Sequence, residues 1–191
     1  MNRKRFLRKE IFLKLSNISR EERKRSSGLV CERIANGSLF KSAERIIFYD
    51  ARRHELCLKP LVDISKSEGK GILWPRVVGE DLEFVACEKY EDLVPGAFGI
   101  LTPPITMLGV SLKSSDLILI PGLAFDRRGV RLGSGKGFFD RALSRPTANQ
   151  AFRCGIGYEF QWLSWVPQEA WDLRVDTFIS PDKTRKPENW R

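Results

Sequence analysis

The residues best suited to chemistry lie together in residues 119–141, which read LIPGLAFDRRGVRLGSGKGFFDR. The segment has glycines at three alternate positions, Gly133, Gly135 and Gly137. Glycine has no Cβ, so backbone N–H groups there can approach an anion closely, and the N-terminus of a following helix adds positive potential. Lys136 and Arg131 supply full charges, and Asp140 lies where a carboxylate can hold a divalent cation that bridges phosphates. The segment therefore predicts a phosphate-binding site.

Two common phosphate-binding motifs do not fit this segment. A Walker A loop needs Gly-x-x-x-x-Gly-Lys-Ser/Thr, but Val130 stands in place of its first glycine and Gly137 in place of its hydroxyl residue. The dinucleotide-binding fingerprint also fails, because Phe138 takes the position of the third glycine. A flexible glycine turn between a strand and a helix is the open alternative, and the surrounding charges favour the phosphate site.

The spacing of apolar residues predicts helices and strands that alternate along the chain. Helices are expected over residues 3–15, 19–36, 55–66 and 138–143, and strands over residues 45–49, 71–74, 82–87, 116–120, 154–158 and 175–180. Ser19 and Glu22 form a capping-box pattern, and Gly37 is expected to end that helix in a left-handed conformation. Pro75 is expected to close the second strand, and residues 90–110 to form a functional loop.

This alternation favours a single-domain, three-layer α/β/α fold with a mostly parallel, Rossmann-like sheet. We expect residues 1–191 to form one domain, with residues 181–191 as a loosely held tail. Ligands of open α/β sheets bind beyond the carboxyl ends of the strands, and the glycine segment follows the most apolar strand. The fold and the motif therefore predict a site at the same edge of the sheet.

The composition is that of a soluble globular protein, with 42% hydrophobic and 30% charged residues among 191. No apolar run is long enough to cross a membrane, and charges interrupt the N-terminal region where a signal peptide needs an apolar core. The four cysteines form no Cys-x-x-Cys pair, so we expect free thiols and a cytoplasmic location. Zinc is not expected, because His54 is the single histidine.

The formal net charge of +9 suits a nucleic acid, an anionic membrane surface or an anionic small substrate as partner. It is also compatible with a basic surface that has no partner. Arg23-Lys24-Arg25 is a short basic run, but the basic residues are otherwise dispersed and no nucleic-acid-binding motif is present. We therefore expect small anionic substrates, and neither nucleic acid nor membrane, as partners.

The glycine segment resembles the signature of the 5-formyltetrahydrofolate cyclo-ligase family, also called methenyltetrahydrofolate synthetases. The shared features are Pro-Gly-x-Ala-Phe-Asp and then Arg-Leu-Gly-x-Gly-x-Gly-aromatic-aromatic-Asp-Arg. Further likenesses follow in the family's order along nearly the whole chain: Lys4 and Arg8, His54-Glu55, Phe98-Gly99-Ile100 with Pro103, residues 155–161, Pro167, and Val175-Asp176.

The resemblance implies an enzyme that uses ATP and Mg²⁺ to close 5-formyltetrahydrofolate to 5,10-methenyltetrahydrofolate, with release of ADP and phosphate. It implies catalytic roles for Lys136 and Arg131, and magnesium ligation by Asp140 and Asp176. The implied ATP contacts are Lys4, Arg8, Arg131, Leu132, Gly133, Ser134, Gly135, Lys136, Gly137, Phe138 and Phe139. The implied folate contacts are Glu55, Phe98, Ser134, Gly135, Lys136, Gly137 and Phe138. We expect a monomer.

Several of these residues also have purely structural interpretations. Lys4 and Arg8 share one helix face and could form a solvated charge stripe. Glu55 could stabilise a helix N-terminus, and Asp176 could be a turn residue at a strand start. The aromatic pair at 138–139 could belong to the core, although a phenyl face can also stack on a pterin.

The sequence departs from the family pattern at four places. A tyrosine pair is replaced by Phe138-Phe139, a glutamate by Thr102, a threonine by Leu58, and a frequent histidine by Trp171. Two other functions stay open beside the active enzyme, the first because of these departures and the second because of the net charge. One is a folate- or nucleotide-binding relative with weakened catalysis, and the other is a basic nucleic-acid-binding protein.

Overall fold

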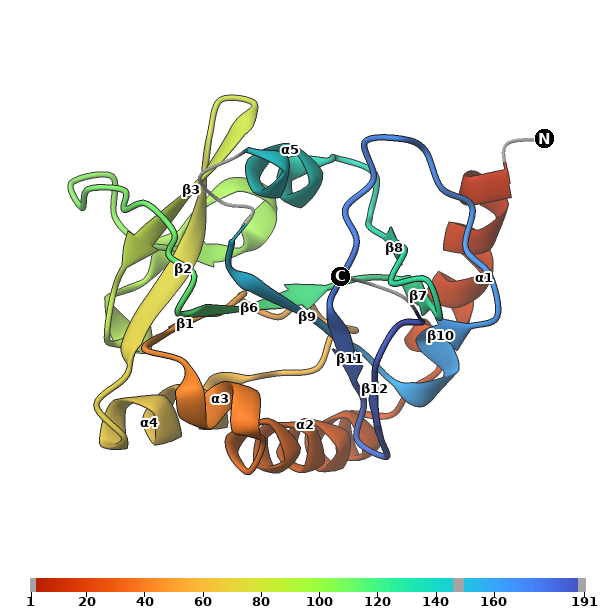
Figure 1. Ribbon diagram of the computed structural model, residues 1–191, viewed down its shortest axis with the longest axis horizontal. Coiled ribbons are helices and arrows are strands. Elements are labelled where there is room, and N and C mark those ends of the chain that lie inside the picture. The colour runs from red at the N-terminus through yellow and green to blue at the C-terminus, as the bar shows by residue number, and fades with distance from the viewer. Residues whose placement is uncertain (1–2, 146–149, 189–191) are drawn as a thin grey trace.

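The computed structural model describes residues 3–145 and 150–188, and its centre is a seven-stranded sheet. Its strand order is β12-β11-β9-β6-β1-β2-β3 (Figure 1). The parallel strands are β1 (Arg45–Ile47), β2 (Gly71–Val78), β6 (Asp116–Pro121), β9 (Phe152–Ile156) and β11 (Thr177–Ile179). The edges are antiparallel, with β3 (Asp81–Ala86) paired to β2 and β12 (Thr184–Arg185) paired to β11. The expected mixed α/β fold with a mostly parallel sheet is confirmed.

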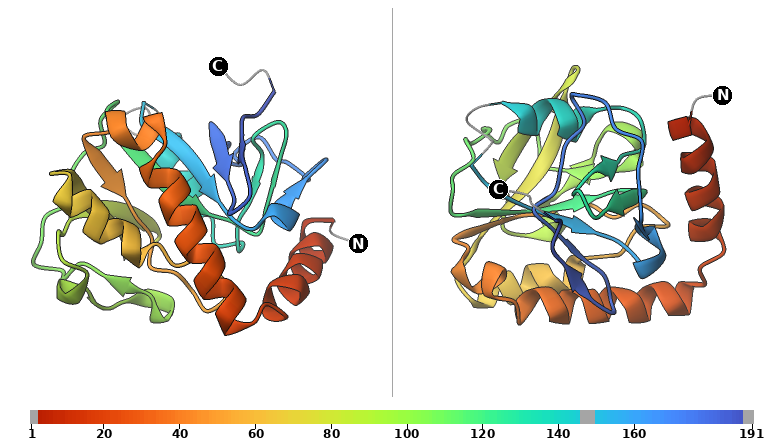
Figure 2. Two further views of the ribbon diagram at one scale, coloured as in Figure 1. Left: turned by 90° about the horizontal axis from the view of Figure 1, so that it is seen from below. Right: turned by 45° about the vertical axis from the view of Figure 1, so that its right-hand side comes forward.

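Helices cover both faces of this sheet. Helices α2 (Arg20–Ala35), α3 (Ser38–Ser42) and α4 (Lys59–Ser67) lie on the lower face in Figure 1, and α5 (Phe138–Ser144) lies on the upper face. The first helix, α1 (Arg3–Ser16), stands apart from these layers and meets the start of α2 at an angle (Figure 2). No helix in the described part of the chain is long and apolar enough to span a membrane.

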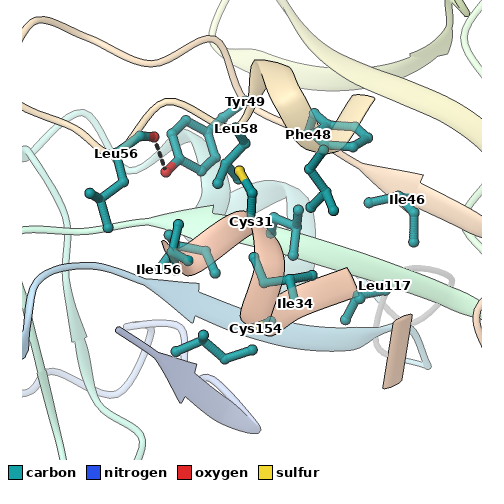
Figure 3. Packing of buried hydrophobic residues seen from close by; sticks show 14 of the residues in the cluster. Cys31, Ile34, Ile46, Phe48, Tyr49, Leu56, Leu58, Leu117, Cys154 and Ile156 are labelled. Carbon is teal, nitrogen blue, oxygen red and sulfur yellow. Dashed lines mark hydrogen bonds between the residues drawn. The ribbon is translucent and has the colours of Figure 1, made fainter. Parts of the chain in front are cut away.

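The buried side chains form two hydrophobic clusters, one on each face of the sheet. The cluster under α2–α4 contains Ile34, Phe48 and Leu117, which Figure 3 shows at close range. There the Tyr49 hydroxyl donates a hydrogen bond of 2.8 Å to the Leu56 carbonyl. The cluster under α5 contains Phe125 and Phe178, with ring centroids 4.9 Å apart. Alternate residues of a strand face opposite sides of the sheet, so the apolar central strands contribute side chains to both clusters.

Helix α4 begins later than the sequence pattern predicts, at Lys59 instead of residue 55. Pro60 lies in its first turn, where the missing N–H costs nothing, and residues 52–55 form a turn of their own. Glu55 therefore lies ahead of the helix, and the idea that it stabilises a helix N-terminus is wrong. Its carboxylate instead accepts a hydrogen bond of 2.9 Å from the Arg52 backbone N–H.

Helix α2 keeps only part of its expected capping. The Ser19 side chain accepts a hydrogen bond from the Glu22 N–H at 3.0 Å, but the Glu22 carboxylate binds Arg25 and Ser26 instead of reaching back. Gly37 has a φ of −78°, so its expected left-handed conformation is wrong. The chain enters α3 directly, and a Cβ at Gly37 would come within 3.2 Å of the Ile34 carbonyl oxygen. Close packing is thus the reason for this glycine.

Strand β2 runs through Pro75 to Val78 instead of closing there. Cys87 donates its N–H to the Ile72 carbonyl, so residues 72, 74 and 76 point their backbone groups at β3. Pro75 points its missing N–H away from β3, on the side where β1 has already ended at Ile47. The proline therefore removes no ladder hydrogen bond.

The connecting segments also contain short strands. In residues 90–110, β4 (Val94–Pro95) pairs with β5 (Leu101–Thr102) around a 3₁₀ turn, Ala97–Gly99. Strands β10 (Trp162–Leu163), β7 (Ala124–Asp126) and β8 (Arg131–Leu132) form a separate three-stranded sheet. The predicted late strands end at Ile156 and Ile179. The expected loose tail is partly wrong, because β12 pairs with β11, while residues 189–191 lie outside the described part.

Candidate active site

The glycine segment leaves β8 and returns as α5, beyond the carboxyl end of the central strand β6. Gly135 and Gly137 have φ values of 105° and 71°, in the left-handed region that other residues rarely adopt. At Gly133 the reason for glycine is space, because a Cβ would come within 2.9 Å of the Arg131 guanidinium. The loop therefore needs its three glycines for separate physical reasons.

A cleft of about 730 Å³ opens against this loop. Its walls come from α1, the turn after β1, the loop of residues 94–103, the glycine segment and α5. The predicted site residues that line it are Arg8, Glu55, Phe98, Arg131, Gly133, Ser134, Lys136, Gly137, Phe138, Phe139 and Asp140. The volume suits a ligand of drug-like size, and its apolar wall carries a few polar groups that can fix orientation.

Helix α1 is tied to the glycine loop through Arg8. The Arg8 Nε donates a hydrogen bond of 3.0 Å to the Gly133 carbonyl, and its guanidinium lies 3.6 Å from where a Cβ of Gly135 would stand. The structure therefore brings together residues that are more than 120 positions apart in the sequence. Arg8 is more than part of a solvated charge stripe.

Phe98 stands over the glycine loop from the opposite wall. Its ring centroid is 5.8 Å from that of Phe138, and the Lys136 ammonium lies 5.4 Å from the Phe98 centroid. Phe98 has a φ of 61°, the single positive value for a non-glycine residue among those described, and it is 54% exposed. Such a conformation costs free energy, on the order of 1–3 kcal/mol, and is common at ligand-binding positions.

Arg131 lies beneath the loop and is 6% exposed. It donates to both carboxylate oxygens of Asp140, at 3.1 and 3.0 Å, and to the Pro121 carbonyl at 3.1 Å. Burial raises the pKa of Asp140, but the Arg131 charge and the Leu173 N–H outweigh that effect, so this pKa lies below its ordinary value. Asp140 is therefore an ionised carboxylate at neutral pH.

Lys4 does not line the large cleft. It is 8% exposed, and its ammonium donates to Glu169 at 2.8 Å and to Asp172 at 2.6 Å. Burial lowers the pKa of Lys4, but these two carboxylates outweigh it, so the pKa is raised. Glu169 and Asp172 line a second cleft of about 560 Å³, which also has Asp140 in its wall. Asp140 therefore lies between the two clefts.

Three further predicted site residues lie outside both cleft linings. Leu132 is buried in the same hydrophobic cluster as Ile34 and Phe48, and Gly135 is at the exposed tip of its loop. Asp176 is buried at the amino end of β11, the edge opposite the carboxyl end of β6. Its carboxylate accepts a hydrogen bond of 2.8 Å from the Arg153 N–H. The described residues hold no group of three or more His, Cys, Asp or Glu side chains that could bind a metal.

Glu55 lies across the large cleft from α5, in the turn that follows β1. Burial raises the pKa of its carboxyl group, and the hydrogen bond from the Arg52 N–H only partly offsets this.

The structure also shows where the residues that depart from the family pattern lie. Leu58 is core, Trp171 is 69% exposed beside the second cleft, and the Thr102 hydroxyl donates to the Pro75 carbonyl at 3.1 Å.

Several polar residues that line the large cleft were not predicted from the sequence, among them Asp50 and Arg76. Asp50 accepts hydrogen bonds from the Tyr90 hydroxyl at 2.6 Å and from the Leu101 N–H at 2.8 Å. Arg76 is buried and donates to the Pro104 carbonyl and to Glu83, while its Nε has no partner. The position of Asp50, directly after a predicted strand, is a signal that could have identified it.

Comparison with known proteins agrees with this geometry. Residues 1–181 match the model of the 5-formyltetrahydrofolate cyclo-ligase family. The chain is 27% identical to a mouse 5-formyltetrahydrofolate cyclo-ligase over 94% of both chains, and 31% identical to one from Mycolicibacterium smegmatis over 68% of this chain and 63% of the other.

Solved structures show the same relationship. A 5,10-methenyltetrahydrofolate synthetase from Aquifex aeolicus superimposes with a TM-score of 0.85 at 33% identity, covering 98% of this chain and 94% of the other. A synthetase from Mycoplasma pneumoniae shares the fold, with a TM-score of 0.73 at 23% identity over 95% of this chain and 99% of the other. The chain therefore belongs to the 5-formyltetrahydrofolate cyclo-ligase family.

Proposed function

We propose that this protein catalyses the ATP-dependent closure of 5-formyltetrahydrofolate to 5,10-methenyltetrahydrofolate, with release of ADP and phosphate. The observation that carries the proposal is the glycine loop with Lys136 on one wall of the large cleft and the strained Phe98 on the other. A loop of this shape can hold phosphates, and the two phenyl rings offer faces for a flat heterocycle. Family membership supplies the reaction.

The two clefts suggest a place for each substrate. The larger cleft, with Phe98 and Phe138 in its wall, suits the folate. The smaller cleft suits the nucleoside of ATP, so that the triphosphate passes Asp140 towards Lys136. In this arrangement Lys4 supports the nucleotide part of the site, because its two carboxylate partners, Glu169 and Asp172, both line the second cleft.

The chemistry follows from this placement. The formyl oxygen is a poor leaving group, so it first attacks the γ-phosphorus of ATP, and the bond from phosphorus to ADP breaks. The 10 nitrogen then attacks the formyl carbon, the carbon–oxygen bond breaks as phosphate leaves, and the nitrogen loses its proton. Such phosphoryl transfer depends mainly on positioning and on stabilisation of charge.

Lys136 is the residue that can act directly on the transferred group. Its ammonium is exposed in the loop and can neutralise charge on the phosphoryl oxygens as they move. Arg131 instead acts from below, because its guanidinium is held by Asp140 and the Pro121 carbonyl. Of the two predicted catalytic residues, Arg131 therefore fixes the loop and Asp140, and Lys136 contacts the substrate.

A magnesium ion fits Asp140, since this ion commonly binds one or two carboxylates together with substrate phosphates. Asp140 is ionised and lies between the clefts. Magnesium bound there would shield the charge of the triphosphate.

Magnesium ligation by Asp176 stays a prediction from the family resemblance, as do the cytoplasmic location and the monomeric state. The free thiols of all four cysteines agree with a reducing compartment.

The test is an absorbance assay for the methenyl product, with purified protein, magnesium, ATP and 5-formyltetrahydrofolate. We expect product and ADP to form in equal amounts. Lys136→Ala should lower kcat by at least about a hundredfold, in line with the loss of a preorganised charge. Lys66→Ala is the matched control, because Lys66 is an exposed lysine on α4. A protein that binds ATP and folate without forming product would contradict the proposal and favour a weakened relative.

A further inference from the structure

Asp50 joins the two ends of the loop that carries Phe98. Its Oδ1 accepts a hydrogen bond from the Tyr90 hydroxyl at the start of the loop, at 2.6 Å. Its Oδ2 accepts one from the Leu101 N–H at the end, at 2.8 Å. Each carboxylate oxygen thus has its own donor, and the two donors are 11 positions apart in the sequence.

The start of the loop is a firm anchor. The Tyr90 ring packs edge-on against the buried Trp74, with centroids 5.6 Å apart, and the Lys59 ammonium lies 4.3 Å from its centroid. The hydroxyl of Tyr90 is therefore held in place before it meets Asp50. The carboxylate transfers that fixed position to Leu101, the first residue of β5.

The middle of the loop depends on its ends. Gly96 donates its N–H to the Ile100 carbonyl at 2.9 Å, so the turn around Phe98 closes on itself. Phe98 at its tip has a φ of 61°, which persists only where the surrounding structure holds it. The ring then lies over Phe138 and over Lys136 of the glycine loop. A shift of Leu101 would move this ring relative to the glycine loop.

We propose that Asp50 is a positioning residue that sets the folate affinity of the enzyme by holding Phe98 over the cleft. This inference rests on the proposed folate contact of Phe98. Asp50 acts through its two hydrogen bonds and not through its charge. An asparagine can preserve both, because its oxygen accepts from Leu101 while its amide donates to the Tyr90 hydroxyl, which can also be an acceptor. An alanine loses both.

The experiment compares KM values for 5-formyltetrahydrofolate and for ATP, together with kcat. Asp50→Ala should raise the folate KM about tenfold, a size that fits the loss of hydrogen bonds to a charged group, and should leave the ATP KM unchanged. Asp50→Asn should stay within about threefold of the wild type, and Tyr90→Phe should lie between them. Asp63→Ala is the matched control, because Asp63 is an exposed carboxylate on α4.

The double variant with Phe98→Ala tests whether Asp50 acts through Phe98. Phe98→Ala alone should raise the folate KM, and adding Asp50→Ala should raise it by less than twofold more. Hydrogen exchange gives a readout that does not need catalysis: the amides of residues 93–102 should exchange faster in Asp50→Ala and at the wild-type rate in Asp50→Asn.

Four results would overturn the inference. Asp50→Ala could leave the folate KM unchanged, its effect could persist in full in the Phe98→Ala background, or Asp50→Asn could match Asp50→Ala, which would indicate a charge role. If Phe98→Ala itself leaves the folate KM unchanged, the inference fails while the product assay still upholds the closure reaction. The two failures are therefore distinguishable.

Discussion

Lys4 offers a sharp test of whether one residue supports both the fold and nucleotide binding. Its ammonium lies between Glu169 and Asp172, whose side chains are 47% and 13% exposed, while that of Lys4 is 10% exposed. Lys4→Met keeps the length and the apolar stem but removes the charge. It leaves Asp172 without its cation, so we expect a loss of stability and a higher KM for ATP.

The magnitude follows from the two hydrogen bonds. A hydrogen bond to a charged group contributes roughly 1.5–3 kcal/mol, but the half-exposed Glu169 contributes well under 1 kcal/mol. We therefore expect Lys4→Met to destabilise the protein by about 2–3 kcal/mol. For a chain of this size, that lowers the Tm by roughly 4–12 °C, measurable by calorimetry or circular dichroism.

A compensated variant separates the two roles. Lys4→Met combined with Asp172→Asn and Glu169→Gln removes the uncompensated charges, so we expect most of the lost Tm to return while the ATP KM stays high. Lys14→Met is the matched control, because Lys14 is an exposed lysine on the same helix. The reasoning is refuted if Lys4→Met melts like Lys14→Met, or if the compensated variant also recovers its ATP affinity.

Three further predictions concern Gly137 of the glycine loop, Gly28 of α2 and Asp140. Gly137→Ala should lower the free energy of unfolding by roughly 1 kcal/mol and lower kcat/KM for ATP, because Gly137 has a φ of 71°. Gly28 lies in the middle of α2 with free space around it, so Gly28→Ala should raise the free energy of unfolding by about 0.5–1 kcal/mol, measured by thermal melting. The folded-state pKa of Asp140 is lowered from 3.8, so its pair with Arg131 contributes stability that is present above that pH and lost as the pH falls through the folded pKa. Asp140→Asn should therefore flatten the unfolding free energy against pH in the acid range; an unchanged slope would contradict this pairing.

The sequence predicted the order of strands and helices well because each element carries its own pattern. The apolar run of β6 and the β-branched residues of β1 are local signals that need no tertiary contact. The predicted ends of these elements were wrong where pairing with a strand far away in the sequence decides them. Pro75 stays in β2 because of the register with β3, and residues 184–185 form a strand because β11 offers an open edge.

The site shows the same division. The residue spacing within 131–140 was enough to predict a loop that carries Lys136 and is followed by Asp140, because these residues are close together in the sequence. Arg8 was identified through the family resemblance, but only the fold shows that its guanidinium meets the Gly133 carbonyl. Asp50 and Arg76 were missed, since their partners Pro104, Tyr90 and Leu101 lie 28 to 51 residues away. The only local mark is the position of Asp50 directly after a strand.

By itself the sequence determined a basic α/β chain with a glycine-rich loop, predicted to bind phosphate, and the motifs of one enzyme family. Only the tertiary structure decided that Lys4 faces two carboxylates beside a second cleft, that Arg131 lies under the loop, and that Asp50 holds the Phe98 turn. The physical reason is that hydrogen bonds and ion pairs depend on atoms within about 3 Å, and those distances are set by the packing of elements far apart in the chain.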